Sequence, residues 1–304
     1  MLSRYTTRQG LTWVDLESPT RGEVSSLTEE YNLHPVMAEE LLTRNERVKV
    51  DLYENAIYLA LHFPLRNRTT GQVQETEIDF ILLKNALITT HYELIDPLHD
   101  FAKGFEKEMY LTNATTSEHA GLLFFAQVRE LYKHTAYILE VVEKEIREIE
   151  REIFKGEEAK MVVRLSRVNR SLIDIKSALR LHKETLRSLA GACGHLYGNS
   201  FEYQLSVIEG EFTHLAQVLN ETKETLTDLR RTNDSLLSTK TSTAMRQLAA
   251  VNVIMLPLGL ITWIFAMESK LLNLDDPLRL GAVFLGMVII CVLSVVYFRS
   301  KKWL

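Results

Sequence analysis

Two long apolar runs near the C-terminal end constrain this chain more than any other feature. Residues 248–267 and 280–298 contain no charged side chain over 20 and 19 positions. A helix needs about 20 apolar residues to cross the hydrocarbon core of a bilayer. Only the twelve residues 268–279 separate the runs, so the pair predicts a transmembrane hairpin. The alternative is a buried helical hairpin in a soluble protein, which leaves the basic residues outside both runs unexplained.

The distribution of Lys and Arg predicts the orientation of this hairpin. Basic residues flank the outer ends of the runs: Arg230, Arg231, Lys240 and Arg246 on one side, and Arg299, Lys301 and Lys302 on the other. The joining loop is acidic in balance, with Glu268, Asp275 and Asp276 against Lys270 and Arg279. Because cytoplasmic loops carry an excess of Lys and Arg, both termini are predicted to be cytoplasmic. The chain then is a multi-pass protein of the inner membrane.

The remaining composition excludes several classes of function. With 25% charged residues and a net charge of −5, the chain has no basic stripe for nucleic acid. Cys193 and Cys291 lie far apart and suggest neither a disulfide framework nor a thiolate metal site. No phosphate-binding glycine loop and no nucleophile–base motif is present. We therefore expect no enzyme and no resident cofactor, and the ligands of any bound metal stay unassigned.

The first part of the chain, residues 1–115, predicts an α/β domain. TWVDL (12–16) alternates as a strand and precedes a helix that we expect to begin with Ser18 as N-cap and Pro19 at its first position. Residues 55–63 predict a strand that ends before Pro64. Residues 77–91 predict a β-hairpin with a tight turn at Asn85-Ala86.

Helical patterns follow and predict a helical hairpin over 116–200. The stretch GACGHLYGNS (191–200) interrupts the helical pattern. One apolar stripe recurs at spacings of 4, 3 and 4: Val142, Ile146, Ile149 and Ile153. The charges between them predict a solvated surface, with a contact surface for another helix as the open alternative. Residues 201–247 predict a stalk helix continuous with the first span, about 80 Å long at 1.5 Å per residue. Such a helix suggests packing against copies of itself.

The stretch MRQLAAVNVIMLPLGLITWIFAM (245–267) resembles the first transmembrane helix of the CorA-type divalent metal cation transporters. That family's pattern runs M-K-x-L-T, then P-L, then Gly-Met-Asn, and the matching residues are Met245, Arg246, Leu248, Pro257, Leu258 and Met267. TWVDLESP, NLHPVMAEEL, RVKVDLYENAIYLAL and LITTHYE are similar to segments of the family's soluble part, in the same order. FRSKKWL is similar to its basic C-terminal ending.

The resemblance implies an α+β cytoplasmic domain, a long stalk helix and two transmembrane helices, assembled as a CorA-like pentameric funnel. The partners it implies are four further copies of the chain, the lipid bilayer and divalent metal ions. Four departures mark a divergent branch: Ala266 and Glu268 stand where the signature has Gly and Asn, Ser242 replaces an Asn at the inner mouth, and Ala249 replaces a Thr. The ion, Mg²⁺ or a Zn²⁺, Co²⁺ or Ni²⁺ type, therefore stays open.

The pore residues follow from the signature and from helical spacing. Glu268 and Met267 align with the signature, and five copies of Glu268 would form a carboxylate ring that attracts cations and whose crowding favours proton uptake. Asn252 is the only strongly polar side chain within 248–267, which marks a pore site or an interhelical hydrogen bond. Positions at spacings of three or four add Ser242 as a polar pore residue and Met245, Leu248 and Leu256 as a hydrophobic gate. Leu256 is equally explained as a packing residue.

The remaining candidates lie outside the spans. Asp275 and Asp276 in the joining loop would concentrate cations, or form an ordinary polar loop. Arg299, Lys301 and Lys302 form a basic cytoplasmic collar that anchors the topology or, as the resemblance implies, takes part in the gate. The predicted division is 1–115, 116–200, 201–247, 248–267, 268–279, 280–298 and 299–304. A divalent cation transporter is the function predicted, and a non-conducting pentameric scaffold or regulatory protein on the same fold is the alternative.

Overall fold

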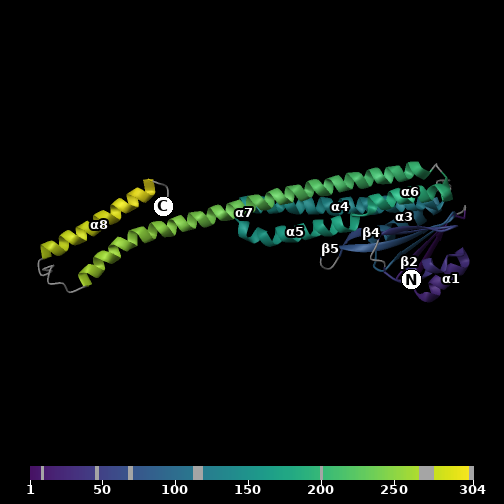
Figure 1. Cartoon of the computed structure of the whole chain (residues 1–304), viewed down its shortest axis with the longest axis horizontal. Helices are drawn as coiled ribbons and strands as arrows, with labels where there is room; N and C mark the ends of the chain where they lie inside the picture. Colours follow the sequence, from purple (N-terminus) through teal and green to yellow (C-terminus); the bar gives the residue numbers. More distant parts are fainter. Residues whose placement is uncertain are drawn as a thin grey trace. The chain divides into compact units, whose positions relative to one another are not determined.

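The computed structural model describes residues 1–7, 10–44, 48–67, 71–111, 119–198, 201–266 and 277–300. The chain divides into two compact units. The first contains Met1–Gly156 and Lys160–Leu229, and the second contains Glu157–Ala159 and Arg230–Leu304. Figure 1 shows the helices and strands of the chain, coloured along the sequence.

A six-stranded mixed sheet forms the centre of the first unit, in the order β1-β2-β6-β5-β4-β3. Strands β2 and β6 are parallel, and every other neighbouring pair is antiparallel. The predicted strand at TWVDL and the predicted hairpin are both confirmed, although the hairpin turn lies at Lys84-Asn85, just before β6 begins. The strands are β1 Leu2–Thr6, β2 Thr12–Glu17, β3 Lys49–Leu52, β4 Ile57–Arg66, β5 Val73–Leu82 and β6 Ala86–His91.

Strand β4 continues through Pro64, so the prediction that it ends before this residue is wrong. Pro64 pairs with Glu75 of β5 on one side. On the other side the short strand β3 reaches only to Ala60. Because β4 is an edge strand beyond that point, the missing N–H of Pro64 leaves no ladder bond unmade.

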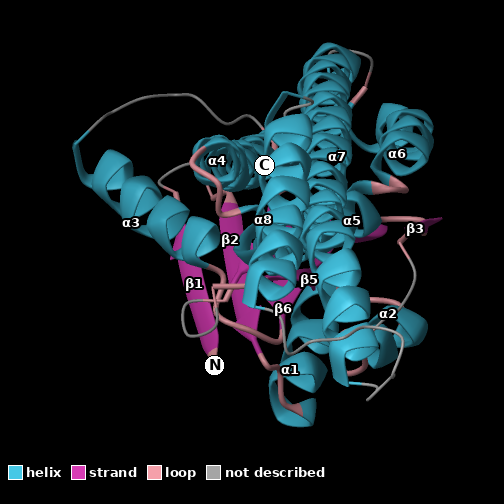
Figure 2. Cartoon of the chain, turned by 90° about the vertical axis from the view of Figure 1, so that its left-hand side faces the viewer, coloured by secondary structure: helices cyan, strands magenta, loops and turns pink. Residues whose placement is uncertain are grey.

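Helices cover both faces of the sheet (Figure 2). One face packs with α1 (Arg21–Tyr31) and α2 (Pro35–Glu40) around a core that includes Val14, Tyr58 and Ile88. The other face packs against α4 (Ala120–Phe154), where the ring of Phe80 meets that of Phe124 at 5.2 Å. Helix α3 (Asp96–Leu111) in turn contacts α4. Both faces of the central strands are therefore buried, which explains their nearly continuous apolar sequences.

Helix α1 begins two residues later than predicted. Thr20, not Ser18, is its N-cap: the Thr20 hydroxyl accepts from the Glu23 amide, and the Glu23 carboxylate accepts from the Thr20 amide. This reciprocal pair satisfies two amides that the helix itself leaves unbonded. Ser18 instead has a positive φ of 48° and donates its hydroxyl hydrogen to the Tyr92 carbonyl.

Three helices, not a hairpin, occupy the interval after α3: α4, then α5 (Glu158–Leu179), then α6 (His182–Tyr197). Helix α6 runs through Gly191 and Gly194, so the predicted interruption at 191 is wrong. The helix ends only at Gly198, whose φ of 75° needs a residue without a Cβ atom. The predicted stripe from Val142 to Ile153 is confirmed as a buried face of α4.

The start of α4 packs very closely on neighbouring rings. A Cβ atom added to Gly121 would lie 2.9 Å from Nδ1 of His119 and 3.0 Å from Cζ of Phe201. The His119 ring also stacks on Tyr197 at 4.5 Å. Only glycine leaves room for this approach.

Helix α7 (Glu202–Ala266) has 65 residues, about 100 Å at 1.5 Å per residue. The predicted long helix continuous with the first span is confirmed. Within the first unit α7 buries one stripe in its own chain: Leu205, Ile208, Phe212, Leu215, Leu219, Leu226 and Leu229. Each such side chain contributes about 1.5–3 kcal/mol through burial. This part of α7 is therefore buried within its own chain, and the packing of α7 against further copies stays a prediction.

The second unit contains the remainder of α7, the short segment Glu157–Ala159 and α8 (Pro277–Ser300). Within the described residues, α7 carries a stretch long and apolar enough to cross a membrane, and only 6% of that stretch is buried. Helix α8 adds a shorter apolar stretch, Phe284–Tyr297.

Candidate ion-conducting site

The predicted pore residues before the signature all lie on the continuous helix α7. At about 100° per residue, Met245, Asn252 and Leu256 fall within about 40° of one another around its axis. Ser242 and Leu248 flank them, so all five share one face about 120° wide. The helix thus brings together side chains that the sequence spaces over fourteen residues.

This face is exposed in the single chain. Met245, Leu248 and Leu256 are 61–63% exposed, and Ser242 and Asn252 are also exposed. Among the described side chains from 241 to 263, Ala250 alone is fully buried, and it lies about 140° around the helix from Met245. A row of exposed apolar side chains is unfavourable in water, so this face fits a membrane or a partner helix.

Several predicted site residues lie outside the described part of the chain. These are Met267, Glu268, Asp275, Asp276, Lys301 and Lys302. The backbone of Arg299 belongs to the last turn of α8, but its side chain is not described. Their roles stay predictions.

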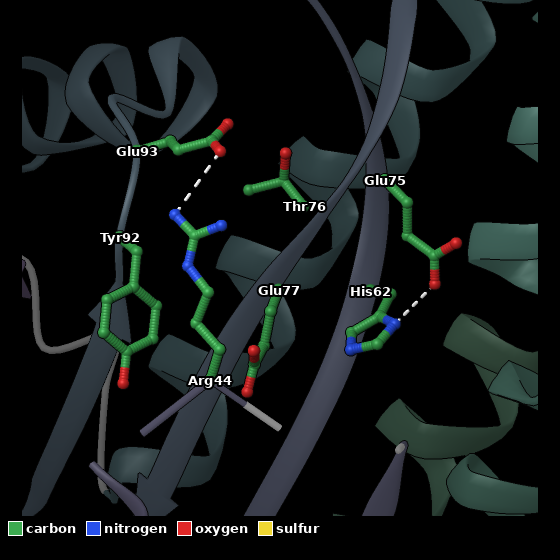
Figure 3. A pocket seen from close by; sticks show the side chains of 7 residues that line it. All are labelled: Arg44, His62, Glu75, Thr76, Glu77, Tyr92 and Glu93. Carbon is green, nitrogen blue, oxygen red and sulfur yellow. Dashed lines mark hydrogen bonds and ion pairs between the residues drawn. The ribbon is translucent and has the colours of Figure 1, made fainter. Parts of the chain in front are cut away.

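A polar cavity of about 170 Å³ lies on the sheet in the first unit. Figure 3 shows Arg44 reaching toward Glu93, at 3.5 Å, while Nδ1 of His62 contacts Glu75 at 2.5 Å. Glu77 also lines this cavity. Within the described residues no group of three or more His, Cys, Asp or Glu side chains is arranged to hold a metal ion.

Asp79 lies in the same strand as Glu75 and Glu77 and is fully buried. Burial, followed by the charge of Glu77, raises the pKa of Asp79 well above its usual range. Asp79 is not among the predicted site residues, although it is the single acid within the apolar stretch IDFILL (78–83).

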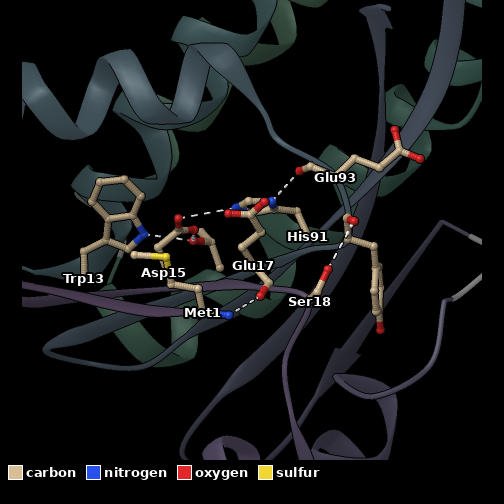
Figure 4. Close-up of polar contacts among 9 residues, drawn as sticks. Met1, Trp13, Asp15, Glu17, Ser18, His91 and Glu93 are labelled. Atoms are coloured by element: carbon tan, nitrogen blue, oxygen red, sulfur yellow. Dashed lines mark hydrogen bonds and ion pairs between the residues drawn. The ribbon is translucent and has the colours of Figure 1, made fainter.

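A chain of hydrogen bonds joins β2 to β6 (Figure 4). Nε1 of Trp13 donates to the Thr89 hydroxyl at 2.9 Å, and that hydroxyl donates to Oδ1 of Asp15 at 2.5 Å. His91 contacts Oδ2 of Asp15 through Nε2 at 3.3 Å and the Glu93 carbonyl through Nδ1 at 2.6 Å. Because a carboxylate and a carbonyl both only accept, this setting favours the imidazolium form of His91, in which both ring nitrogens donate.

The comparisons with known proteins identify the family. Residues 8–302 match the family described as CorA-like Mg2+ transporter protein. The chain belongs to the CorA family. It is 24% identical over 295 residues to the cobalt/magnesium transport protein CorA of Thermotoga maritima, covering 96% of this chain and 83% of that protein.

Solved structures show the same fold. The CorA magnesium transporter from Methanocaldococcus jannaschii is similar with a TM-score of 0.85 and 19% identity, covering 97% of this chain and 92% of that one. The full-length CmaX protein is similar with a TM-score of 0.74 and 12% identity, covering 96% and 88%. The predicted fold is confirmed: a mixed α/β domain, a long stalk helix and a C-terminal apolar helix. CorA-family proteins are membrane transporters of metal ions and not enzymes, which confirms that part of the prediction as well.

Proposed function

We propose that this CorA-family chain forms a homopentamer that conducts divalent cations through a pore lined by α7. The observation that carries the proposal is the exposed face of α7, which combines Ser242, Met245, Asn252 and Leu256 on one side of a membrane-length helix. Five such faces around one axis would shield the apolar side chains from bulk solvent and enclose a narrow path. The CorA-family membership and the fold similarity support the same assembly.

Each ring on this face has a distinct physical role. Rings of Met245, Leu248 and Leu256 form apolar constrictions that close by losing their water. A ring of Asn252 amides offers neutral oxygens to the waters of a hydrated cation, which suits Mg²⁺ because it gives up its waters reluctantly. Ser242 hydroxyls offer weaker contacts at the inner end.

The two mouths carry opposite charges. Glu268 beside Met267 places a carboxylate ring at the outer mouth, and Asp275 and Asp276 add negative charge near it. Such a ring raises the local concentration of cations and favours them over anions. At the cytoplasmic end Arg299, Lys301 and Lys302 form the basic collar.

The transported ion is a small divalent cation. The relative from Thermotoga maritima is named for cobalt and magnesium, and the change from Asn to Glu at 268 widens the choice to Zn²⁺ and Ni²⁺. The proposed placement has residues 1–247 and 299–304 in the cytoplasm, spans at 248–267 and 280–298, and the loop 268–279 outside the inner membrane.

Flux into liposomes tests this function. The purified chain is reconstituted, and uptake of Mg²⁺, Co²⁺, Ni²⁺ and Zn²⁺ is measured with and without a pH gradient. We expect uptake of at least one ion by the parent protein. Asn252→Ala and Glu268→Asn should each change the rate or the ion preference.

Glu140→Gln is the matched control, because Glu140 is an exposed carboxylate on α4, far from 268 in sequence, and the change removes the same charge. Its flux should equal that of the parent. Uptake of none of the four ions at any pH would refute the channel and leave the non-conducting scaffold. An unchanged profile for Glu268→Asn would remove Glu268 from the mechanism.

A further inference from the structure

We propose that the ion pair between Lys240 and Glu158 is a clamp that keeps the part of α7 beyond its buried stripe from twisting about the helix axis, and so helps to determine which face of that part lines the pore. The inference rests on the proposed function. It adds a contact outside the pore residues: Glu158, at the turn between α4 and α5, would hold α7 at one rotation about its axis.

The pair has an asymmetric setting that suits a clamp. Nζ of Lys240 donates to Oε2 of Glu158. Glu158 is the first residue of α5 and is only 4% exposed. The hydrogen bond from Lys240 lowers the pKa of Glu158, and the amide at the start of the helix acts in the same direction. The carboxylate is thus fixed by its own helix, while the lysine comes from α7.

The position of the pair along the chain connects it to the pore segment. The short segment Glu157–Ala159 belongs to the same compact unit as α7 from Arg230 onward. Lys240 stands two residues before Ser242 and five before Met245. From 241 to 249 every described side chain of α7 is exposed, so the pair lies where the exposed segment begins.

Helical geometry places the clamp on the side opposite the proposed pore. At about 100° per residue, Met245, Asn252 and Leu256 lie about 140°, 120° and 160° around the axis from Lys240. Asn233, which is fully buried, lies within about 20° of Lys240. One side of α7 is therefore held by its own chain, and the opposite side carries the candidate pore residues.

This arrangement gives the pair a mechanical consequence. A rotation of α7 by one residue, about 100°, would replace Met245 by Ala244 or Arg246 on the pore face. A single ion pair on the back of the helix resists such a rotation because moving Lys240 leaves the Glu158 carboxylate buried without its charged partner. Helices at subunit interfaces do shift and rotate between functional states, so a contact that resists rotation is of consequence here.

Disulfide cross-linking between copies tests the clamp without measuring transport. In a background with Cys193→Ala and Cys291→Ala, the variants Ala244→Cys, Met245→Cys and Arg246→Cys are oxidised in membranes. With the clamp intact, cross-linking should be strongest at 245. Adding Glu158→Gln or Lys240→Met should remove this preference, and the exchange Glu158→Lys with Lys240→Glu should restore it.

The matched control is the pair between Glu152 and Lys155, which lies beside the same turn but stays within α4 and its C-cap, at 2.7 Å. Glu152→Gln and Lys155→Met should leave the preference for 245 unchanged. In liposomes, breaking the clamp should change the flux about two- to fivefold, the range that a partly exposed ion pair supplies.

The outcomes separate the two proposals. A preference for 245 that survives both Glu158→Gln and Lys240→Met would overturn the clamp and leave the pore in place. Absence of cross-linking at all three positions in the parent background would show that the copies do not meet along α7, which overturns the proposed pore and the clamp together.

Discussion

Acidification from pH 7 to pH 4 is expected to destabilise the region around His182, the first residue of α6. This histidine is fully buried. Its Nε2 donates to the His62 carbonyl at 2.7 Å, and its Nδ1 therefore accepts from the Tyr132 hydroxyl at 2.8 Å. The ring is neutral in this arrangement. A second proton on Nδ1 would displace the hydrogen bond from the Tyr132 hydroxyl and place a positive charge where water does not reach it.

The size of the effect follows from the pKa of His182. Burial lowers it from an ordinary value of 6.5 to about 4, and the charge of a nearby His62 adds to this while the hydrogen bond to the His62 carbonyl opposes it. Between these two values the unfolded chain holds more protons than the folded chain, so stability falls as the pH falls. At about 1.36 kcal/mol for each pH unit, the loss approaches about 3 kcal/mol at pH 4 and below.

The assay compares the parent with His182→Gln across this pH range. A glutamine amide keeps one donor for the His62 carbonyl and one acceptor for the Tyr132 hydroxyl, but it does not titrate. Hydrogen exchange of the detergent-solubilised full chain, followed at peptides from β4 and α6, reports the local free energy of opening. The parent should lose about 3 kcal/mol more than the variant between pH 7 and pH 4.

The exposed histidine of α7, His214, provides the control. His214→Gln should follow the parent curve. Parallel curves of opening free energy against pH for the parent and His182→Gln would refute the reasoning. They would show that the pKa of His182 does not differ between the folded and the unfolded chain.

Three further perturbations test other parts of the structure. Burial lowers the pKa of His91, but the hydrogen bond to Asp15 and the charge of Asp15 outweigh burial, so the pKa is raised. The stabilisation that protonated His91 gives the fold is therefore present below pH 6.5 and is lost as the pH rises through the raised pKa. His91→Gln should therefore lower the melting temperature more at pH 6 than at pH 9, and an equal loss at both would contradict this. Gly121→Ala should cost about 1–3 kcal/mol in urea unfolding because the added carbon overpacks the rings around it, whereas Gly22→Ala on open α1 is the control. Thr20→Ala should cost about 1 kcal/mol and Thr20→Asp little, since the aspartate also caps; equal losses would exclude the cap.

Local periodicity made much of the fold predictable. The charge-free runs, the long helix through 202–266 and the stripe on α4 depend on residues close in sequence, and a 3.6-residue period reveals them directly. The same period predicts that Met245, Asn252 and Leu256 share one face, and the continuous helix α7 places them there.

Short and exposed elements gave no comparable signal. Strands β1 and β3 were not predicted because they are edge strands of 5 and 4 residues with mixed polarity. The N-cap was assigned to Ser18 because propensity alone does not distinguish it from Thr20. Two contacts make Thr20 the N-cap. The Glu23 carboxylate accepts from the Thr20 amide, and the Ser18 hydroxyl is bonded to the Tyr92 carbonyl instead of the helix.

The sequence by itself determined that this chain has apolar segments of membrane length, a stalk helix and the CorA-family pattern, because these depend on composition and near neighbours. Only the tertiary structure decided which distant groups meet. The Asp15–His91 bond joins residues 76 apart, and the Lys240–Glu158 pair joins residues 82 apart. Such contacts depend on how strands and helices are ordered in space, and many different orders satisfy the same local preferences.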